Sequence, residues 1–143
     1  MDDLDRNILA LLGADARLSV ATLARRLKVA RSTLQARLER LETSGVIAGY
    51  TLRLGESARG IRLRATMLIS TEQRSLPALL SRLKTTPEVE RVLTCAGRFD
   101  VMVQLAAADP TALDHALGQI AALPGITQAE TLVHLATRLD RTA

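Results

Sequence analysis

Leucine and isoleucine recur every three or four residues through the first third of the chain, the spacing that places side chains on one face of a helix. The pattern predicts a first helix over about residues 3–12, ended by Gly13. A second helix is expected from an N-terminal cap at Ser19 to about Lys28. A third begins only two or three residues later. A tight turn must therefore join the last two helices, which is helix-turn-helix spacing.

The third predicted helix separates its leucines from its polar side chains. On a helical wheel, Leu34, Leu38 and Leu41 fall on one side. The opposite side carries short, hydrogen-bonding or cationic side chains, a mixture that can enter the major groove of DNA and read base edges. These side chains are Ser32, Thr33, Ala36 and Arg40, flanked by Arg31 and Gln35. Arg37 lies nearer the leucines, so we expect it to form an ion pair with an acid of the first helix, such as Asp5.

Basic charge is concentrated in this part of the chain. Six basic residues and no acidic residue lie between Asp15 and Glu39, whereas residues 61–143 carry nine basic and eight acidic side chains. Such a patch suits a polyanionic partner. The alternative is an amphipathic helix whose arginines only keep it soluble, but solvated faces ordinarily mix Glu with Lys and Arg. The charge pattern therefore favours DNA binding.

Residues 61–143 predict a second domain in which strands and helices alternate. A small, polar, glycine-bounded segment at 55–60 precedes it as a natural linker. The expected elements are strands at 61–70, 89–95, 101–105 and about 126–135, with helices that start after Ser75 and at Asp109–Pro110. The order βαββαβ predicts a ferredoxin-like fold, whose helices cover one face of the sheet. We expect the other face, lined by Leu, Met and Val, to pair sheet to sheet in a dimer.

Composition places the chain among globular proteins and gives little support to enzyme chemistry. No apolar run approaches the ~20 residues that cross a bilayer, and the N-terminus is acidic, so we expect a cytoplasmic protein without membrane contact. The single cysteine, Cys95, is expected inside a strand as a small apolar residue. His115 and His134, expected to be partly exposed, have no companions at metal-ligand spacing, and glycine-rich phosphate loops are absent. We therefore expect no catalytic residue, metal or cofactor.

Several motifs of the first half resemble the Lrp/AsnC (feast/famine) transcriptional regulators of bacteria and archaea. They are Asp5–Leu9, Arg17–Ser19, Leu23–Ala24, Arg37–Glu42 and Gly45–Tyr50, in the order and spacing of that family. The resemblance implies an α+β protein with a winged helix-turn-helix domain at 1–50, a hinge strand and linker at 51–60, and an αβ effector-binding and oligomerisation domain at 61–143. It also implies double-stranded DNA as partner, a homodimer that assembles further, and a possible amino-acid effector.

The turn before the third helix departs from the family pattern. The family usually has Gly-Leu-Ser where this chain has Lys28-Val29-Ala30. Because an Ala cap is about 1 kcal/mol less favourable than Ser, either Ser32 caps a helix that starts later or the turn is locally different. We expect Arg25, Lys28 and Arg31 on DNA phosphates. The residues expected near base edges are Ser32, Thr33, Gln35, Ala36 and Arg40.

A short loop in the second domain matches the family's Gly-x-(Tyr/Phe)-Asp effector loop. It consists of Gly97, Arg98, Phe99 and Asp100, and Thr131 stands where the family has a threonine in its final strand. Asp100 could accept a hydrogen bond from an effector's ammonium group; alternatively, the loop is a generic turn in which Asp100 bonds its own backbone.

Three kinds of function compete for the whole chain. A ligand-responsive, sequence-specific DNA-binding regulator accounts for the basic segment, the turn between helices and the second domain together. An architectural DNA-binding protein with little sequence preference is the alternative, in which the loop of residues 97–100 is structural. A small enzyme on a ferredoxin-like scaffold leaves the first 50 residues without a purpose.

Overall fold

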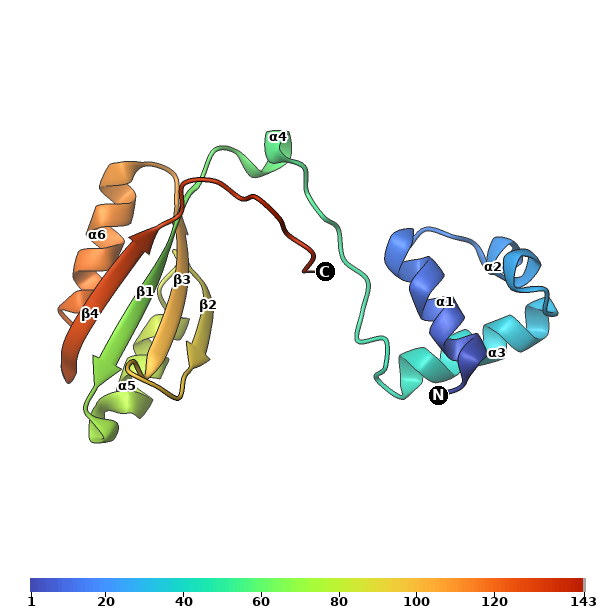
Figure 1. Ribbon diagram of the computed structural model, residues 1–143, viewed down its shortest axis with the longest axis horizontal. Coiled ribbons are helices and arrows are strands. Elements are labelled where there is room, and N and C mark those ends of the chain that lie inside the picture. Colours follow the sequence, from blue (N-terminus) through green and yellow to red (C-terminus); the bar gives the residue numbers. More distant parts are fainter. Residues whose placement is uncertain (143) are drawn as a thin grey trace. The chain divides into compact units, whose positions relative to one another are not determined.

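The computed structural model describes residues 1–142, with the side chain of Glu56 left out, and divides the chain into two compact units. One unit contains Met1–Arg53 and the other Leu54–Asp140 (Figure 1). Within residues 1–142, no helix is long and apolar enough to cross a membrane.

The N-terminal unit consists of three helices, α1 (Asp3–Ala14), α2 (Val20–Leu27) and α3 (Arg31–Thr43). The predicted cap at Ser19 is confirmed, because its Oγ accepts a hydrogen bond from the Thr22 backbone N–H at 3.1 Å. The predicted end at Gly13 is wrong: α1 runs through this glycine to Ala14. Glycine lowers helix propensity by about 1 kcal/mol, but the Asp15 N–H still reaches the Leu11 carbonyl at 3.0 Å and completes the last turn.

The apolar stripes of the three helices meet in one small core. Ile8 of α1, Leu23 of α2 and Leu34 of α3 are at most 1% exposed. Leu12, Ala24 and Leu41 complete the buried cluster. The side chains that the helical spacing placed on a common face therefore form the contacts that hold α1, α2 and α3 together.

The chain leaves α3 through a glycine turn and then runs extended. Gly45 has a φ of +80°, a conformation that favours glycine, and the Ile47 N–H donates to the Leu41 carbonyl at 2.9 Å. Residues 46–53 form no strand within the described chain, since no neighbouring strand of the same chain offers them a backbone ladder. The single-turn helix α4 (Glu56–Arg59) lies in the segment expected to be a linker.

The second unit is a four-stranded antiparallel sheet with two helices, as the pattern predicts. The strands are β1 (Leu63–Thr71), β2 (Val89–Thr94), β3 (Val101–Ala107) and β4 (Ile126–Val133), in the order β2-β3-β1-β4, and the helices are α5 (Leu76–Lys84) and α6 (Pro110–Ala121). Both helices pack on one face of the sheet, where Leu83 of α5 and Ile120 of α6 join Ile69 and Val103 in the core. This is the ferredoxin-like βαββαβ fold (Figure 1).

Four local expectations for this unit are corrected by the structure. Ile61 precedes β1 and is 93% exposed. Ser75 ends a short 3₁₀ turn, η1 (Gln73–Ser75), and its helical φ and ψ of −92° and −11° do not give a side-chain cap to α5. Cys95 lies after the end of β2 and is exposed. His134 follows β4 rather than lying within it.

The predicted cap at Asp109 is confirmed, since its Oδ1 accepts from the Ala112 N–H at 2.8 Å.

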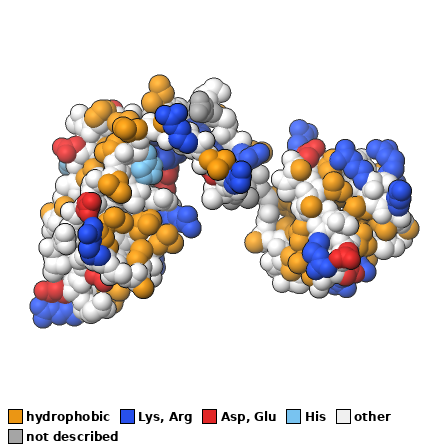
Figure 2. Space-filling view, viewed as in Figure 1, with side chains coloured by type: hydrophobic (Ala, Val, Ile, Leu, Met, Phe, Trp, Pro, Cys, Tyr) orange, Lys and Arg blue, Asp and Glu red, His pale blue; other side chains and the backbone are white. Residues whose placement is uncertain are grey.

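The sheet face opposite the helices is mixed in character rather than lined by Leu, Met and Val alone. Leu68 lies directly opposite Met102, and Met102 lies opposite Leu93, so these three side chains share this face. The valines of β3 instead point to the core, where Val101 and Val103 are fully buried. Polar residues interrupt the apolar patch on the open face: Thr66, Ser70, Gln104 and Glu130. In Figure 2, hydrophobic side chains of this unit accordingly lie among polar and charged ones.

Candidate DNA-binding face and effector loop

The turn between α2 and α3 keeps helix-turn-helix geometry although its residues differ from the family pattern. Lys28 adopts the left-handed conformation, with φ 57° and ψ 44°, where glycine is usual. Ala30 is the N-cap of α3, and its extended backbone places the first helical residue at Arg31. A later start capped by Ser32 is therefore wrong, and α3 begins without a side-chain cap.

The start of α3 presents hydrogen-bond donors and cations to the same exposed surface. Without a capping side chain, the first backbone N–H groups of α3 remain available to an external acceptor, and the positive end of the helix dipole favours an anion there. Arg25, Lys28 and Arg31 are all exposed around this end. Figure 2 shows Lys and Arg side chains gathered along one side of this unit. The side chains expected near base edges are exposed as well: Ser32, Thr33, Gln35 and Ala36.

A buried carboxylate holds α3 against α1. Asp5 is 1% exposed, and its Oδ1 accepts from Arg37 Nη1 at 3.3 Å while its Oδ2 accepts from Arg40 Nη2 at 3.2 Å. Arg37 also contacts the carboxylate of Asp2, the capping residue of α1. The predicted ion pair between Arg37 and an acid of the first helix is confirmed. Arg40, expected at base edges, directs its guanidinium to Asp5 in this structure, although its side chain is 61% exposed.

Interactions within this cluster keep its carboxyl groups ionised and its Arg37 guanidinium protonated. The hydrogen bond from Arg37 and that from the Asp5 backbone lower the pKa of Asp2 to about 2. Burial alone would raise the pKa of Asp5, but the Asp2 backbone N–H and Arg37 outweigh it, so the pKa of Asp5 is lowered. The two carboxylates in turn raise the pKa of Arg37. Both carboxylates are therefore ionised at neutral pH and attract the two guanidinium groups.

The loop of residues 97–100 is tied to β1 through Asp100. The Asp100 N–H donates to the Ile69 carbonyl at 2.8 Å, and its Oδ2 accepts from the Thr71 N–H at 2.9 Å. The carboxylate thus bonds a neighbouring strand and not the backbone of its own loop, which argues against the generic self-bonded turn. Among the described residues, Oδ1 of Asp100 accepts no hydrogen bond and is available to a ligand.

Arg98 and Phe99 organise the surface beside this carboxylate. Arg98 Nη2 lies 3.5 Å from Glu130 Oε2, and its guanidinium carbon lies 5.0 Å from the centre of the Phe99 ring, within cation–π range. Phe99 is only 9% exposed, so it anchors the loop. Thr131 pairs with the core-facing Met67 in the β1–β4 register and therefore lies on the sheet face opposite Glu130. The structure brings residues 97–100 together but does not bring Thr131 onto their face.

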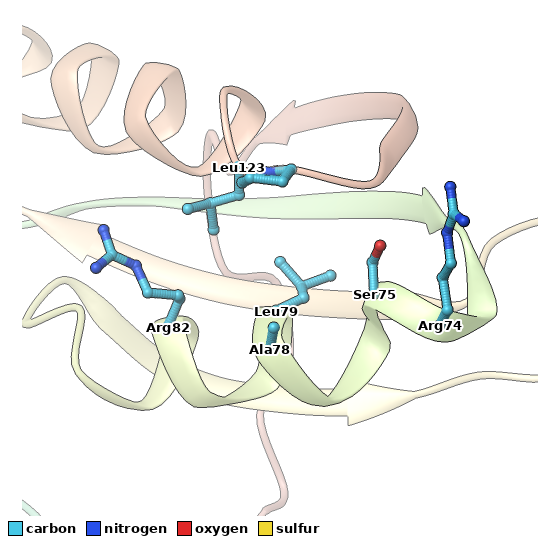
Figure 3. A pocket seen from close by; sticks show the side chains of 7 residues that line it. Arg74, Ser75, Ala78, Leu79, Arg82 and Leu123 are labelled. Atoms are coloured by element: carbon cyan, nitrogen blue, oxygen red, sulfur yellow. The ribbon is translucent and has the colours of Figure 1, made fainter.

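A separate groove lies between the start of α5 and the turn that follows α6 (Figure 3). It has a volume of about 320 Å³ and is lined by Arg74, Ser75, Ala78, Leu79, Arg82, Leu123 and Pro124. In Figure 3, Leu79 and Leu123 face one another across the groove, and the two arginines stand toward its ends. Gly125, which follows Pro124, packs closely against Ser75 of this groove, since an added Cβ would lie 2.2 Å from Ser75 Cβ. No sequence pattern indicates this groove, because its two sides come from distant segments of the chain.

Among the side chains that the structure describes, which exclude that of Glu56, no group of three or more His, Cys, Asp or Glu is arranged to hold a metal ion. His134 instead lies with its Nε2 at 2.7 Å from Thr66 Oγ1.

Comparison with known proteins finds the same two modules. Residues 1–42 match the AsnC-type helix-turn-helix domain, and residues 64–143 match the Lrp/AsnC ligand binding domain. The HTH-type transcriptional regulator LrpA of Mycobacterium tuberculosis is 31% identical over 134 residues, which cover 93% of this chain and 89% of LrpA.

Solved structures agree with the sequence comparison. E. coli AsnC superposes with a TM-score of 0.90 and 26% identity, covering 100% of this chain and 97% of AsnC. The Neisseria meningitidis regulator NMB0573, solved as a complex with L-Met, has a TM-score of 0.88 at 23% identity, covering 98% of this chain and 93% of that regulator. The latter likeness shows a common fold.

The helix-turn-helix unit and the ferredoxin-like unit together define a two-domain transcriptional regulator. The chain belongs to the Lrp/AsnC family, whose members are DNA-binding regulators with a ligand-binding domain and are not enzymes.

Replacement of Ala30 by Ser tests the geometry of the turn. The hydroxyl introduced at the N-cap would accept a backbone N–H in the first turn of α3, so Ala30→Ser should raise the free energy of unfolding by about 1 kcal/mol in denaturant titrations. The same change inside the helix, Ala36→Ser, cannot cap and should lower stability slightly. Equal effects of the two substitutions would contradict an N-cap at Ala30.

Proposed function

We propose that this chain selects specific DNA sequences through α3 and that an amino acid bound at the loop of residues 97–100 tunes its occupancy. The observation that carries the DNA-binding part is the uncapped, cation-flanked N-terminus of α3, with exposed hydrogen-bonding side chains following directly behind it. An architectural protein needs only the cations, whereas this face also offers groups that can read base edges.

Phosphate contacts and base contacts come from different side chains of the helix-turn-helix in this proposal. Arg25, Lys28 and Arg31 bind phosphates on either side of the major groove, together with the free N–H groups of α3. The side chains near base edges are Ser32, Thr33, Gln35 and Ala36. We assign Arg40 a different task from the one expected from sequence: its bond to Asp5 positions α3, and its exposed edge lies beside the backbone of the DNA.

The open sheet face supports a homodimer as the unit that binds DNA in the cytoplasm. Leu93 and Leu132 are 37% and 50% exposed on this face, and Leu68 and Met102 lie between them. A second copy packed face to face would cover these apolar side chains. Two copies present two recognition helices, which suits half-sites spaced by whole turns of the duplex. Further assembly of dimers is the expectation from family resemblance.

The effector part of the proposal rests on Asp100. Its Oδ1 can accept from an ammonium group, while Arg98 and the backbone near Gly97 can bind a carboxylate. The complex of the neisserial regulator with L-Met shows a member of this fold binding an amino acid. Coupling between such sites is typically 1–3 kcal/mol, so an effector would change DNA occupancy by roughly 5- to 150-fold.

Removal of Arg31 tests the phosphate contacts. Arg31→Ala should weaken binding to every duplex and reduce the slope of log affinity against log salt by about one, since one counterion-releasing contact is lost. The measurement is fluorescence anisotropy with selected and random DNA over a range of salt. Arg82→Ala, which removes the same charge from the second unit, should leave the slope unchanged; a slope unchanged in Arg31→Ala as well would rule out the contact.

Neutralisation of Asp100 tests the effector site. Asp100→Asn keeps an oxygen for the Thr71 N–H but loses the charge that attracts an ammonium group. A thermal-shift screen of the twenty amino acids should find a stabilising ligand for the wild-type protein and a reduced or absent shift for Asp100→Asn. Asp114→Asn, on the exposed side of α6, should retain the full shift. A full shift in Asp100→Asn would place the effector elsewhere.

A further inference from the structure

We infer that Glu39 of α3 reads the amino group of a cytosine and rejects guanine and thymine, which present only acceptors to the major groove. The inference rests on the proposed function and adds a specificity-determining residue. Glu39 is the acidic residue at which the basic segment ends, so the charge pattern alone does not indicate it as a DNA contact.

Glu39 lies in line with the residues proposed to read bases. Ser32, Gln35, Ala36 and Glu39 follow one another at offsets of 0, 3, 4 and 7 residues, which places them along one face of α3. Homeodomain recognition helices contact bases from positions with the same offsets. At 1.5 Å per residue, Ser32 and Glu39 are separated by about 10 Å along the helix, which is comparable with the width of the major groove.

The side chain of Glu39 is exposed, and its carboxylate has no interaction partner among the described residues. Among the side chains that the structure describes, it takes part in no ion pair and no hydrogen bond. Its acidic neighbour on the same helix is engaged, because Glu42 Oε1 accepts from the Tyr50 hydroxyl at 3.2 Å. The adjacent arginine is engaged as well, since Arg40 bonds to Asp5 and does not neutralise Glu39. On this face of α3, the carboxylate of Glu39 is therefore available to accept a hydrogen bond from DNA.

A free carboxylate on a DNA-facing surface selects among bases by repulsion as well as attraction. Near phosphates, repulsion makes the negative charge of the carboxylate unfavourable. A hydrogen bond donated to the carboxylate by a base amino group offsets this repulsion. Cytosine presents its N4 amino group in the major groove, and a glutamate can accept from it. Guanine O6 and N7 and thymine O4 are acceptors, so a carboxylate that faces them is left without a donor. Adenine also offers an amino group, at N6, but this group lies beside the N7 acceptor, so cytosine matches a carboxylate better. This combination of attraction and repulsion gives specificity.

The experiment compares base preferences of three full-length proteins. Duplexes selected from a randomised pool by the wild-type protein, Glu39→Gln and Glu42→Gln are sequenced, and affinities are then measured for the selected site with each base pair at every position. Glu42→Gln removes the same charge from the same helix at a residue turned toward Tyr50, so it is the matched control.

We expect the wild-type protein to prefer cytosine at one position of each half-site. Glu39→Gln should reduce this preference by roughly 5- to 150-fold, the discrimination of one good base contact, and leave the other positions unchanged. Because Gln bonds well to adenine, adenine should gain at that position. Glu42→Gln should keep the wild-type preferences.

Two other outcomes separate failure of this inference from failure of the proposed function. If Glu39→Gln keeps every base preference and only binds all duplexes more tightly, Glu39 is a solvated charge near phosphates and the inference is wrong while the proposed function stands. If the wild-type protein selects no sequence at all, the proposed function fails and the inference with it.

Discussion

The position of the DNA-binding face depends on one buried carboxylate. Asp5 of α1 is almost fully enclosed and accepts hydrogen bonds from both Arg37 and Arg40 of α3. Separating a buried carboxylate from its cationic partners leaves an uncompensated charge, which is strongly destabilising. Orientations of α3 that move both arginines away from Asp5 are therefore disfavoured. Leucine packing brings α1 and α3 together, but it tolerates sliding, whereas the two arginines fix which side of α3 faces the core. The exposed stripe from Ser32 to Glu39 follows from that choice.

The second unit has its own point of connection, at Thr71. Its N–H donates to Asp100 Oδ2 at 2.9 Å and its Oγ1 donates to the Gly125 carbonyl at 3.1 Å. One residue at the end of β1 therefore joins the loop of residues 97–100 to the turn before β4. A ligand that altered the hydrogen bonds of Asp100 would act on Thr71 directly, and so on the start of β4, the strand at one edge of the sheet.

Periodicity predicted the elements of this fold because each depends on neighbours close in sequence. The stripes of α1, α2 and α3, the cap at Asp109 and the alternation in β1 are of this kind. The main errors of the sequence-based prediction lie where contacts with distant segments determine the orientation of a side chain. Arg40 has an exposed position on the wheel, but Asp5 of α1 attracts its guanidinium. Ser75 is a local exception: it is the last residue of a 3₁₀ turn, and its helical backbone conformation gives α5 no side-chain cap. The effector loop was visible as a motif, whereas its bond to Thr71 and the groove beside α5 needed the tertiary structure.

The claim that Asp5 holds the recognition helix is tested most directly by a double-mutant cycle on unfolding. Free energies of unfolding are measured for the wild-type protein, Asp5→Asn, Arg37→Gln and the protein with both substitutions. Because Asp5 and Arg37 interact, each single change should destabilise the protein, and the combined change should cost less than the sum of the two. Strictly additive losses would show that the two residues do not interact and would contradict this account.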